Sequence, residues 1–101
     1  MAHQIILSPI AHDDEYDAYE WYEKQLKGLG EEFLQELEIA YRKISLHPTY
    51  NGYIDGKKIL RDYTLPRFPF SIIYRIVDET VQVITVHHFK KHPSKMYGRN
   101  K

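Results

Sequence analysis

The chain has 101 residues, and its 43% hydrophobic and 14% aromatic content is typical of one globular domain rather than of a disordered chain. Because the chain contains no cysteine, a disulfide framework and a thiolate zinc site are excluded. No apolar run approaches the roughly 20 residues of a membrane helix, and the first residues lack the pattern of a signal peptide, so we expect a cytoplasmic protein that does not contact membranes.

The net charge of zero hides an asymmetry between the two halves of the chain. Residues 1–56 carry 4 Lys and Arg against 11 Asp and Glu, a net of −7, whereas residues 57–101 carry 10 against 3, a net of +7. Such a split indicates a basic functional surface built by the C-terminal half. The alternative is that the helices carry acidic solvent faces and the lysines lie at the rim of the sheet without a functional reason.

The N-terminal half predicts one strand and a helical hairpin. The apolar run 5–7 ends at Ser8-Pro9 and predicts a short edge strand. A first helix is expected to begin at residues 12–14, with Asp13 or Asp14 as its cap. Its aromatic and aliphatic residues recur at steps of three and four and predict one buried stripe. These residues are Tyr16, Tyr19, Tyr22 and Leu26.

A glycine break and a second helix follow. Gly28 suits a left-handed position at the end of the first helix. Apolar residues then recur with helical spacing from Phe33 to Ile44, and His47-Pro48 ends the pattern. Two amphipathic helices joined so closely expose one shared apolar face, which requires a sheet beneath it.

The C-terminal half predicts three strands after a loop at residues 48–56. We expect strands at 57–65, 70–77 and 80–88, with a tight hairpin at Asp78-Glu79. Both faces of the strand 70–77 are largely apolar, so one face covers the helices and the other needs a further partner. The fold class is therefore α+β, in the order β-α-α-β-β-β, with a mainly antiparallel sheet of about four strands. One domain spans residues 1–101, and we expect its basic tail, about 94–101, to be loosely ordered.

Several motifs, taken in order, resemble the RelE/ParE toxin superfamily of type II toxin–antitoxin systems. AYEWYE at 18–23 and GLGEEF at 28–33 resemble the family's first helix and glycine hinge. Arg61 and RFPFSIIY at 67–74 resemble the arginine–aromatic–proline strand of the ParE branch. VHHFKKHP at 86–93 is similar to the family's Val-x-His-x-x-Arg-x-Pro ending, with Lys91 in place of the arginine. The resemblance covers about residues 3–97.

This resemblance implies a growth-inhibiting toxin, of the kind that stabilises plasmids, which is held inactive by a cognate antitoxin. It implies that the antitoxin lays an extended or helical segment across the sheet and helices. ParE-like members bind and poison DNA gyrase, whereas RelE-like members cleave messenger RNA on the ribosome. A third alternative is an inactive member that only binds its antitoxin.

For a ribosome-dependent endoribonuclease, the resemblance and the residue chemistry together supply a set of candidates. Cleavage through a 2′-hydroxyl needs an acid and a base, together with cations for the phosphate. His87 or His88 suits the first role because histidine titrates near neutral pH. The cations for the phosphate could be Arg61, Arg67 and Arg75. Tyr97 could orient a base or stack on it.

For a ParE-like toxin only a binding surface is required, and we favour this interpretation because RFPF resembles the ParE branch. The candidate binding residues are Arg61, Arg67, Phe70, Tyr74, Arg75, Lys90, Lys91 and Arg99. The competing interpretation of each arginine is a surface ion pair, for Arg61 with Asp62 or a helix glutamate and for Arg75 with a partner on the adjacent strand. We expect no metal, because neighbours in a strand such as His87 and His88 point to opposite faces, and no cofactor.

Overall fold

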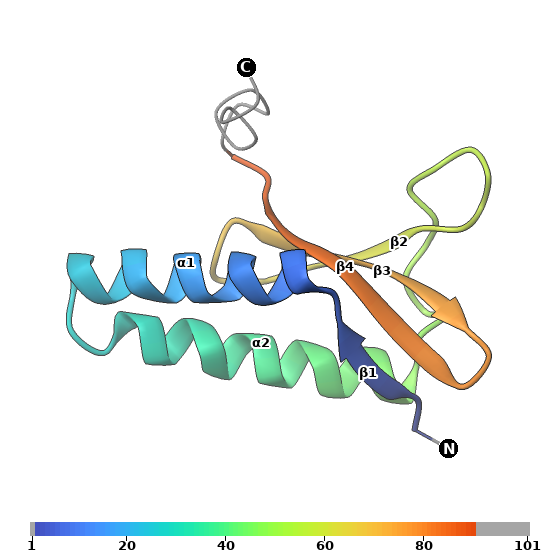
Figure 1. Cartoon of the computed structure of the whole chain (residues 1–101), viewed down its shortest axis with the longest axis horizontal. Helices are drawn as coiled ribbons and strands as arrows, with labels where there is room; N and C mark the ends of the chain where they lie inside the picture. The colour runs from blue at the N-terminus through green and yellow to red at the C-terminus, as the bar shows by residue number, and fades with distance from the viewer. Residues whose placement is uncertain (1, 91–101) are drawn as a thin grey trace.

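The computed structural model describes residues 2–90 and has two helices and a four-stranded sheet. The helices lie together on one face of the sheet (Figure 1), so the predicted α+β class and the order of the elements are confirmed. The predicted tail at about 94–101 lies outside the described residues. The elements are β1 (Gln4–Leu7), α1 (Pro9–Gln25), α2 (Leu29–Leu46), β2 (Arg61–Thr64), β3 (Phe70–Val77) and β4 (Thr80–His88).

The strand order in the sheet is β1-β4-β3-β2, with β1 parallel to β4 and the other pairs antiparallel. The predicted edge position of β1 is therefore confirmed. β3 and β4 have the predicted bounds, and Asp78 occupies a left-handed conformation (φ 56°) in the two-residue turn between them. The register of β3 and β4 shifts beside Ile73 and Tyr74, which leaves Ile84 without a partner in the ladder and bends the strand.

The first helix begins earlier than the sequence predicts. Ser8 is the N-cap, and its hydroxyl accepts the Ala11 N–H at 3.0 Å while Pro9 occupies the first turn. Asp13 and Asp14 therefore lie inside α1 and do not cap it. The Asp14 carboxylate instead accepts the Val86 N–H at 3.0 Å. Val86 lies on β4 beyond the residues that pair with β1, so β1 does not supply an acceptor for this N–H.

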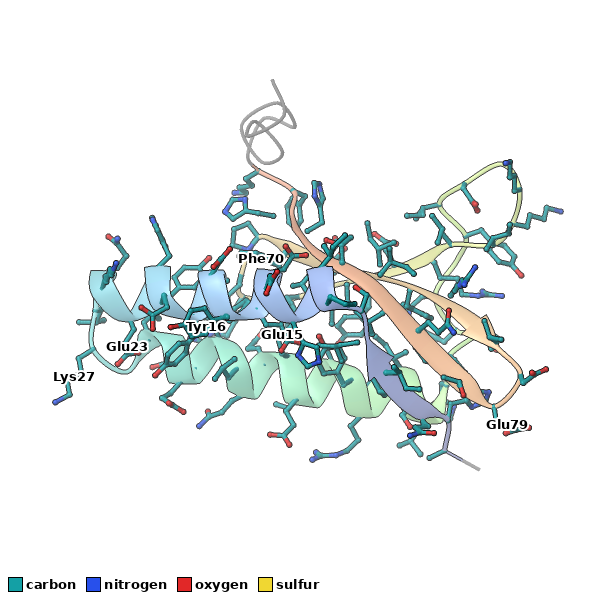
Figure 2. The ribbon with its side chains drawn as sticks, in the orientation of Figure 1. Glu15, Tyr16, Glu23, Lys27, Phe70 and Glu79 are labelled. Atoms are coloured by element: carbon teal, nitrogen blue, oxygen red, sulfur yellow. The ribbon has the colours of Figure 1, made fainter. Side chains whose placement is uncertain are left out.

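The turn between the helices is held by a carboxylate from α1. Glu23 accepts the Gly28 N–H and the Gly30 N–H, each at 2.9 Å, and so satisfies two donors at the start of α2 (Figure 2). Gly28 has the predicted left-handed conformation (φ 93°), although the last residue of α1 is Gln25 and Gly28 stands at the N-cap of α2. The helices can approach this closely because Gly30 lacks a Cβ atom, which would lie 2.7 Å from the Tyr19 carbonyl oxygen.

The predicted stripe of α2 is confirmed, because Phe33, Leu37, Ala40 and Ile44 are all buried. The predicted stripe of α1 is wrong in part. Tyr22 is buried, but Tyr16 and Leu26 are more than 60% exposed. The small residues Ala11 and Ala18 lie in the core with Tyr22, at steps of seven and four, so α1 packs closely through alanines rather than through a row of aromatic rings.

Aromatic side chains from both helices and the sheet meet in the core below the connection between β2 and β3. The rings of Tyr22, Phe33, Phe68 and Phe70 lie with centroids 5.0 to 6.2 Å apart in tilted or edge-to-face contacts. The sequence predicts a longer strand before this connection, at 57–65, but β2 covers only Arg61–Thr64. Residues 57–60 lie instead in the irregular segment before β2, which begins with a turn, and Lys58 is left-handed (φ 59°).

No helix within the described residues is long and apolar enough to cross a membrane.

Candidate functional site

Arg61 binds the backbone of the loop that precedes its own strand. One guanidinium nitrogen donates to the Asn51 carbonyl at 2.6 Å and to the Thr49 carbonyl at 3.3 Å. The guanidinium also lies 4.0 Å from the centre of the Tyr53 ring, in a cation–π contact. These contacts differ from the ion pair with Asp62 or a helix glutamate that the sequence suggests, and they make Arg61 an anchor of the loop.

Arg67 connects the β2–β3 turn to α2. Its guanidinium donates to the Glu32 carboxylate at 2.6 Å and lies 3.8 Å from the Glu36 carboxylate. The hydrogen bond to Glu32 raises the pKa of Arg67. Arg67 and Glu32 are about half exposed, so solvent screens this ion pair and Arg67 stays accessible to a partner.

Arg75 lies on the face of the sheet that points away from the helices. It donates to the Gln82 side chain across β3 and β4 at 2.8 Å, so its partner lies on the adjacent strand as the sequence suggests but is a neutral amide rather than the partner of an ion pair. Ile6 and Val77, which are 46% and 37% exposed, lie on the same face. Among the described elements, neither helix covers this face (Figure 1). It therefore offers a partly apolar surface that also carries the Arg75 guanidinium.

The two histidines that the nuclease hypothesis requires lie on opposite faces of β4. His88 is opposite Phe70 on the helix side, with ring centroids 4.7 Å apart, whereas His87 is opposite Ser71 on the other side. Arg61 is opposite Tyr74, four residues further along β3 than Phe70, a separation of about 13 Å along the strand. The arrangement therefore does not bring Arg61 and either histidine together around one scissile phosphate.

Phe70 and Tyr74, which the sequence suggests as binding residues, are buried in the core. Both are an even number of residues from Ile72, which is fully buried against the helices, so the alternation of the strand turns them inward. The Tyr74 hydroxyl donates to the Pro48 carbonyl at 2.7 Å. These two residues therefore support the fold and the loop instead of contributing to an exposed surface.

Arg67 and Lys90 line one shallow hollow of about 250 Å³ at the end of the sheet where β2 stops and β4 ends. The exposed ring of Phe89 and the prolines of the β2–β3 turn complete its walls, and the Phe89 N–H donates to the Pro69 carbonyl at 3.0 Å. Among the predicted binding residues that the structure describes, Arg67 and Lys90 are the two cations that line this hollow. The predicted site residues Lys91, Tyr97 and Arg99 lie outside the described residues.

Within residues 2–90, no group of three or more His, Cys, Asp or Glu side chains could hold a metal ion. Burial raises the pKa of Glu15, which lies between the helices and accepts a hydrogen bond from Tyr41 (Figure 2). Burial likewise raises the pKa of Tyr41 well above its usual range. This pair lies between α1 and α2, away from the hollow, and joins the helices.

The sequence gives little warning of one feature, the exposed apolar side chains of the loop before β2. Asn51-Gly52 and Asp55-Gly56 indicate a loop, but they do not indicate that its tyrosines and isoleucines stay out of the core. Tyr50, Tyr53, Ile54 and Ile59 are all exposed. The available signal is the presence of four large apolar residues in a segment without the period of a helix or strand.

Comparisons with known proteins identify solved structures that share this architecture. No protein-family model matches the chain, and no curated protein matches it significantly. Solved structures do match. A chain of the chromosomal ParDE TA system from P. aeruginosa is 17% identical with a TM-score of 0.75, over 86% of this chain and 96% of that chain.

Two further structures belong to RelE-type complexes. A mutant of the E. coli toxin RelE in complex with an antitoxin RelBc peptide is 18% identical with a TM-score of 0.65, over 100% of this chain and 96% of that chain. The toxin–antitoxin complex RelBE2 from Mycobacterium tuberculosis matches at 18% identity with a TM-score of 0.60, over 87% of this chain and 99% of that chain. The chain therefore has the fold of the RelE/ParE toxin superfamily, as the sequence resemblance predicts.

Proposed function

We propose that this protein is the toxin of a type II toxin–antitoxin system and that it acts, as ParE-like toxins do, by binding a target such as DNA gyrase. The fold supports the toxin role, because the matching solved structures include toxin–antitoxin complexes. The placement of Arg61, His87 and His88 favours a binding mechanism. These side chains belong to two faces of the sheet and to separate places along it, so they do not form one catalytic site.

The antitoxin would cover the face of the sheet that carries Arg75. Ile6 and Val77 supply apolar contact area on this face, and an acidic antitoxin residue would pair with the Arg75 guanidinium. Burying apolar area of this kind contributes on the order of 25 cal/mol per Å². The sheet face therefore has the chemistry that an amphipathic antitoxin segment requires.

A RelE-like ribosome-dependent endoribonuclease is the second candidate. One observation favours it, namely that Arg67 and Lys90 line the same hollow beside the exposed ring of Phe89. Two cations and an aromatic ring can hold a phosphate and a base. Proton transfer would then depend on a group close to this hollow, and His88 lies only one residue before Phe89.

Induced expression of the chain, alone and together with the neighbouring small reading frame, tests the proposal. We expect growth arrest with the chain alone and rescue when the neighbour is co-expressed. Gyrase poisoning predicts DNA damage with intact messages, whereas the nuclease predicts cuts within ribosome-bound codons that His88→Ala abolishes. Growth without arrest, together with retained binding of the neighbour's product, would identify an inactive member, and absence of both effects would refute the toxin role.

A further inference from the structure

The loop between α2 and β2, residues 48–60, carries a cluster of exposed apolar side chains. We call it the projecting loop, because it stands out from the body of the molecule beside β2 (Figure 1). Tyr50 is 87% exposed, and Tyr53, Ile54 and Ile59 are 46 to 47% exposed. Neighbouring apolar side chains left in water on one element are typical of a surface that binds another molecule.

The first half of the projecting loop is fixed to the sheet by hydrogen bonds, of which the one from Tyr74 to Pro48 is buried. The Tyr74 hydroxyl donates to the Pro48 carbonyl at 2.7 Å and accepts from the Asn51 side-chain amide at 3.1 Å. Arg61 donates to the Asn51 and Thr49 carbonyls and lies over the Tyr53 ring. The loop is therefore anchored by two side chains that belong to the sheet.

The second half is closed by its own hydrogen bonds. The Asp55 carboxylate accepts the Ile59 N–H at 2.9 Å and the Leu60 N–H at 3.1 Å, and these bonds lower the pKa of Asp55. The Ile54 N–H donates to the Leu60 carbonyl at 2.8 Å. Lys58 is held at a φ of 59°. This left-handed conformation is unfavourable for any residue other than glycine. A loop held in one shape pays little entropy when it binds, so its apolar side chains are displayed in a form ready for contact.

The charge of the projecting loop indicates an acidic partner. Lys57 and Lys58 are exposed beside Ile59, whereas the one carboxylate of the loop, Asp55, is occupied by backbone N–H groups. A second copy of the chain, placed loop to loop, would bring these lysines against their own equivalents. A single-stranded RNA would meet the lysines and could stack a base on the exposed Tyr50 ring, but it would leave the exposed aliphatic side chains of Ile54 and Ile59 without an apolar partner. An acidic protein surface with an apolar centre fits both features.

A toxin must bind both its antitoxin and its target protein, and the shape of the projecting loop favours the target protein as its partner. An extended or helical antitoxin segment is itself convex and needs a groove or a sheet face. A projecting loop with large side chains instead needs a concave site, and such sites are found on larger folded proteins. We propose that the projecting loop is the element that enters the target protein, DNA gyrase, through an apolar pocket with an acidic rim. This inference rests on the proposed function and adds the surface that carries it.

Three purified proteins and one probe test this inference. The loop variant carries Tyr50→Ser, Ile54→Ser and Ile59→Ser, and a control variant carries Ile39→Ser and Leu46→Ser, two exposed aliphatic side chains on α2. The probe is purified DNA gyrase, and binding of the neighbouring reading frame's product is measured in parallel. We expect the loop variant to bind gyrase about 30-fold more weakly and to lose growth arrest. Its affinity for the antitoxin should stay within about twofold of the unaltered chain, since that surface is unchanged.

Unaltered gyrase binding or growth arrest in the loop variant would overturn the inference, as would an equal loss in the control variant. Lys57→Glu with Lys58→Glu provides a second test that leaves the apolar contacts in place, should the loop variant fail to fold. This charge reversal should weaken gyrase binding, and the weakening should shrink as salt is raised. If the unaltered chain binds the antitoxin but not gyrase, the gyrase-directed proposed function fails, whereas a loop variant that still binds gyrase refutes only the placement of the contact. Loss of messenger RNA cleavage in the loop variants would assign the loop to RNA and contradict the proposal.

Discussion

At the scale of single residues, Glu15 shows how burial between two helices changes the chemistry of a carboxyl group. Burial raises its pKa from an ordinary value of 4.5, while the Tyr41 hydroxyl and the charge of His12 act in the opposite direction and the charge of Asp14 adds to the rise. The Glu15 carboxyl group therefore holds its proton more tightly in the folded protein than in the unfolded chain. Stability contributed by the protonated form is complete below the unfolded pKa and is lost as pH rises through the folded pKa.

Glu15→Gln removes this titration while keeping an oxygen that can accept the Tyr41 hydroxyl. We expect the variant to be more stable than the unaltered protein at pH 7, by less than about 1 kcal/mol, because Glu15 is partly exposed and solvent screens its charge. The advantage should shrink towards pH 4, where both side chains are neutral. Urea unfolding at the two pH values measures it, and an advantage that grows as pH falls would contradict this assignment.

Residue chemistry could be predicted from the sequence better than residue geometry. Arg75 has a partner on the adjacent strand because register neighbours in a hairpin follow from its short turn, but this partner is the neutral Gln82 and not the member of an ion pair. For Arg61 the alternative to a binding role was an ion pair with a carboxylate, yet Arg61 binds two carbonyl groups of the loop before it. Such a contact depends on how a loop of irregular structure returns to the sheet, and no periodic pattern encodes that path.

At the scale of the elements, the approach of α1 and α2 depends on Gly30. An added Cβ at this position would lie 2.7 Å from the Tyr19 carbonyl oxygen and 2.8 Å from the Glu23 carboxylate, which satisfies the start of α2. In an isolated helix alanine is favoured over glycine by about 1 kcal/mol. Here the contact with the backbone of α1 outweighs that preference, since neither helix can move without disturbing the core.

Gly30→Ala is therefore expected to lower the free energy of unfolding by about 1–3 kcal/mol. Gly56→Ala is the matched control, because a Cβ at Gly56 meets nothing within 4 Å and should change stability little. Chemical unfolding of both variants gives the comparison. A Gly30→Ala protein that is as stable as the control would show that the helices do not need this close contact.

Helices and strands could be predicted where the apolar residues recur with a clear helical or strand spacing, or where turn residues mark the end of the element. The bounds of β3 and β4 follow from two β-rich runs around the Asp78-Glu79 turn, and the stripe of α2 follows from its helical spacing. The start of α1 was missed because Ser8-Pro9 was interpreted as the end of a strand, although a serine followed by proline also begins a helix. The strand predicted at 57–65 is too long because residues 57–60 are irregular, and the left-handed conformation of Lys58 has no signature in the sequence.

At the scale of the whole molecule, the charge asymmetry has a structural counterpart. The acidic half of the chain forms β1, both helices and most of the projecting loop, and the basic half forms the rest of the sheet and the surfaces around it. The described cations nevertheless occupy different places, with Arg75 on the open sheet face, Arg67 and Lys90 at the hollow, and Lys57 and Lys58 on the projecting loop. The cations named here therefore form separate groups rather than one concentrated site.

The most direct test of a gyrase-binding toxin is a reaction of purified DNA gyrase with plasmid DNA in the presence of this protein. We predict that the protein causes cleaved plasmid to accumulate, that addition of the neighbouring reading frame's product prevents the cleavage, and that His88→Ala leaves the cleavage unchanged. Gyrase that works at its normal rate with no cleaved plasmid, while the same preparation cuts messenger RNA on ribosomes in a His88-dependent manner, would contradict this account.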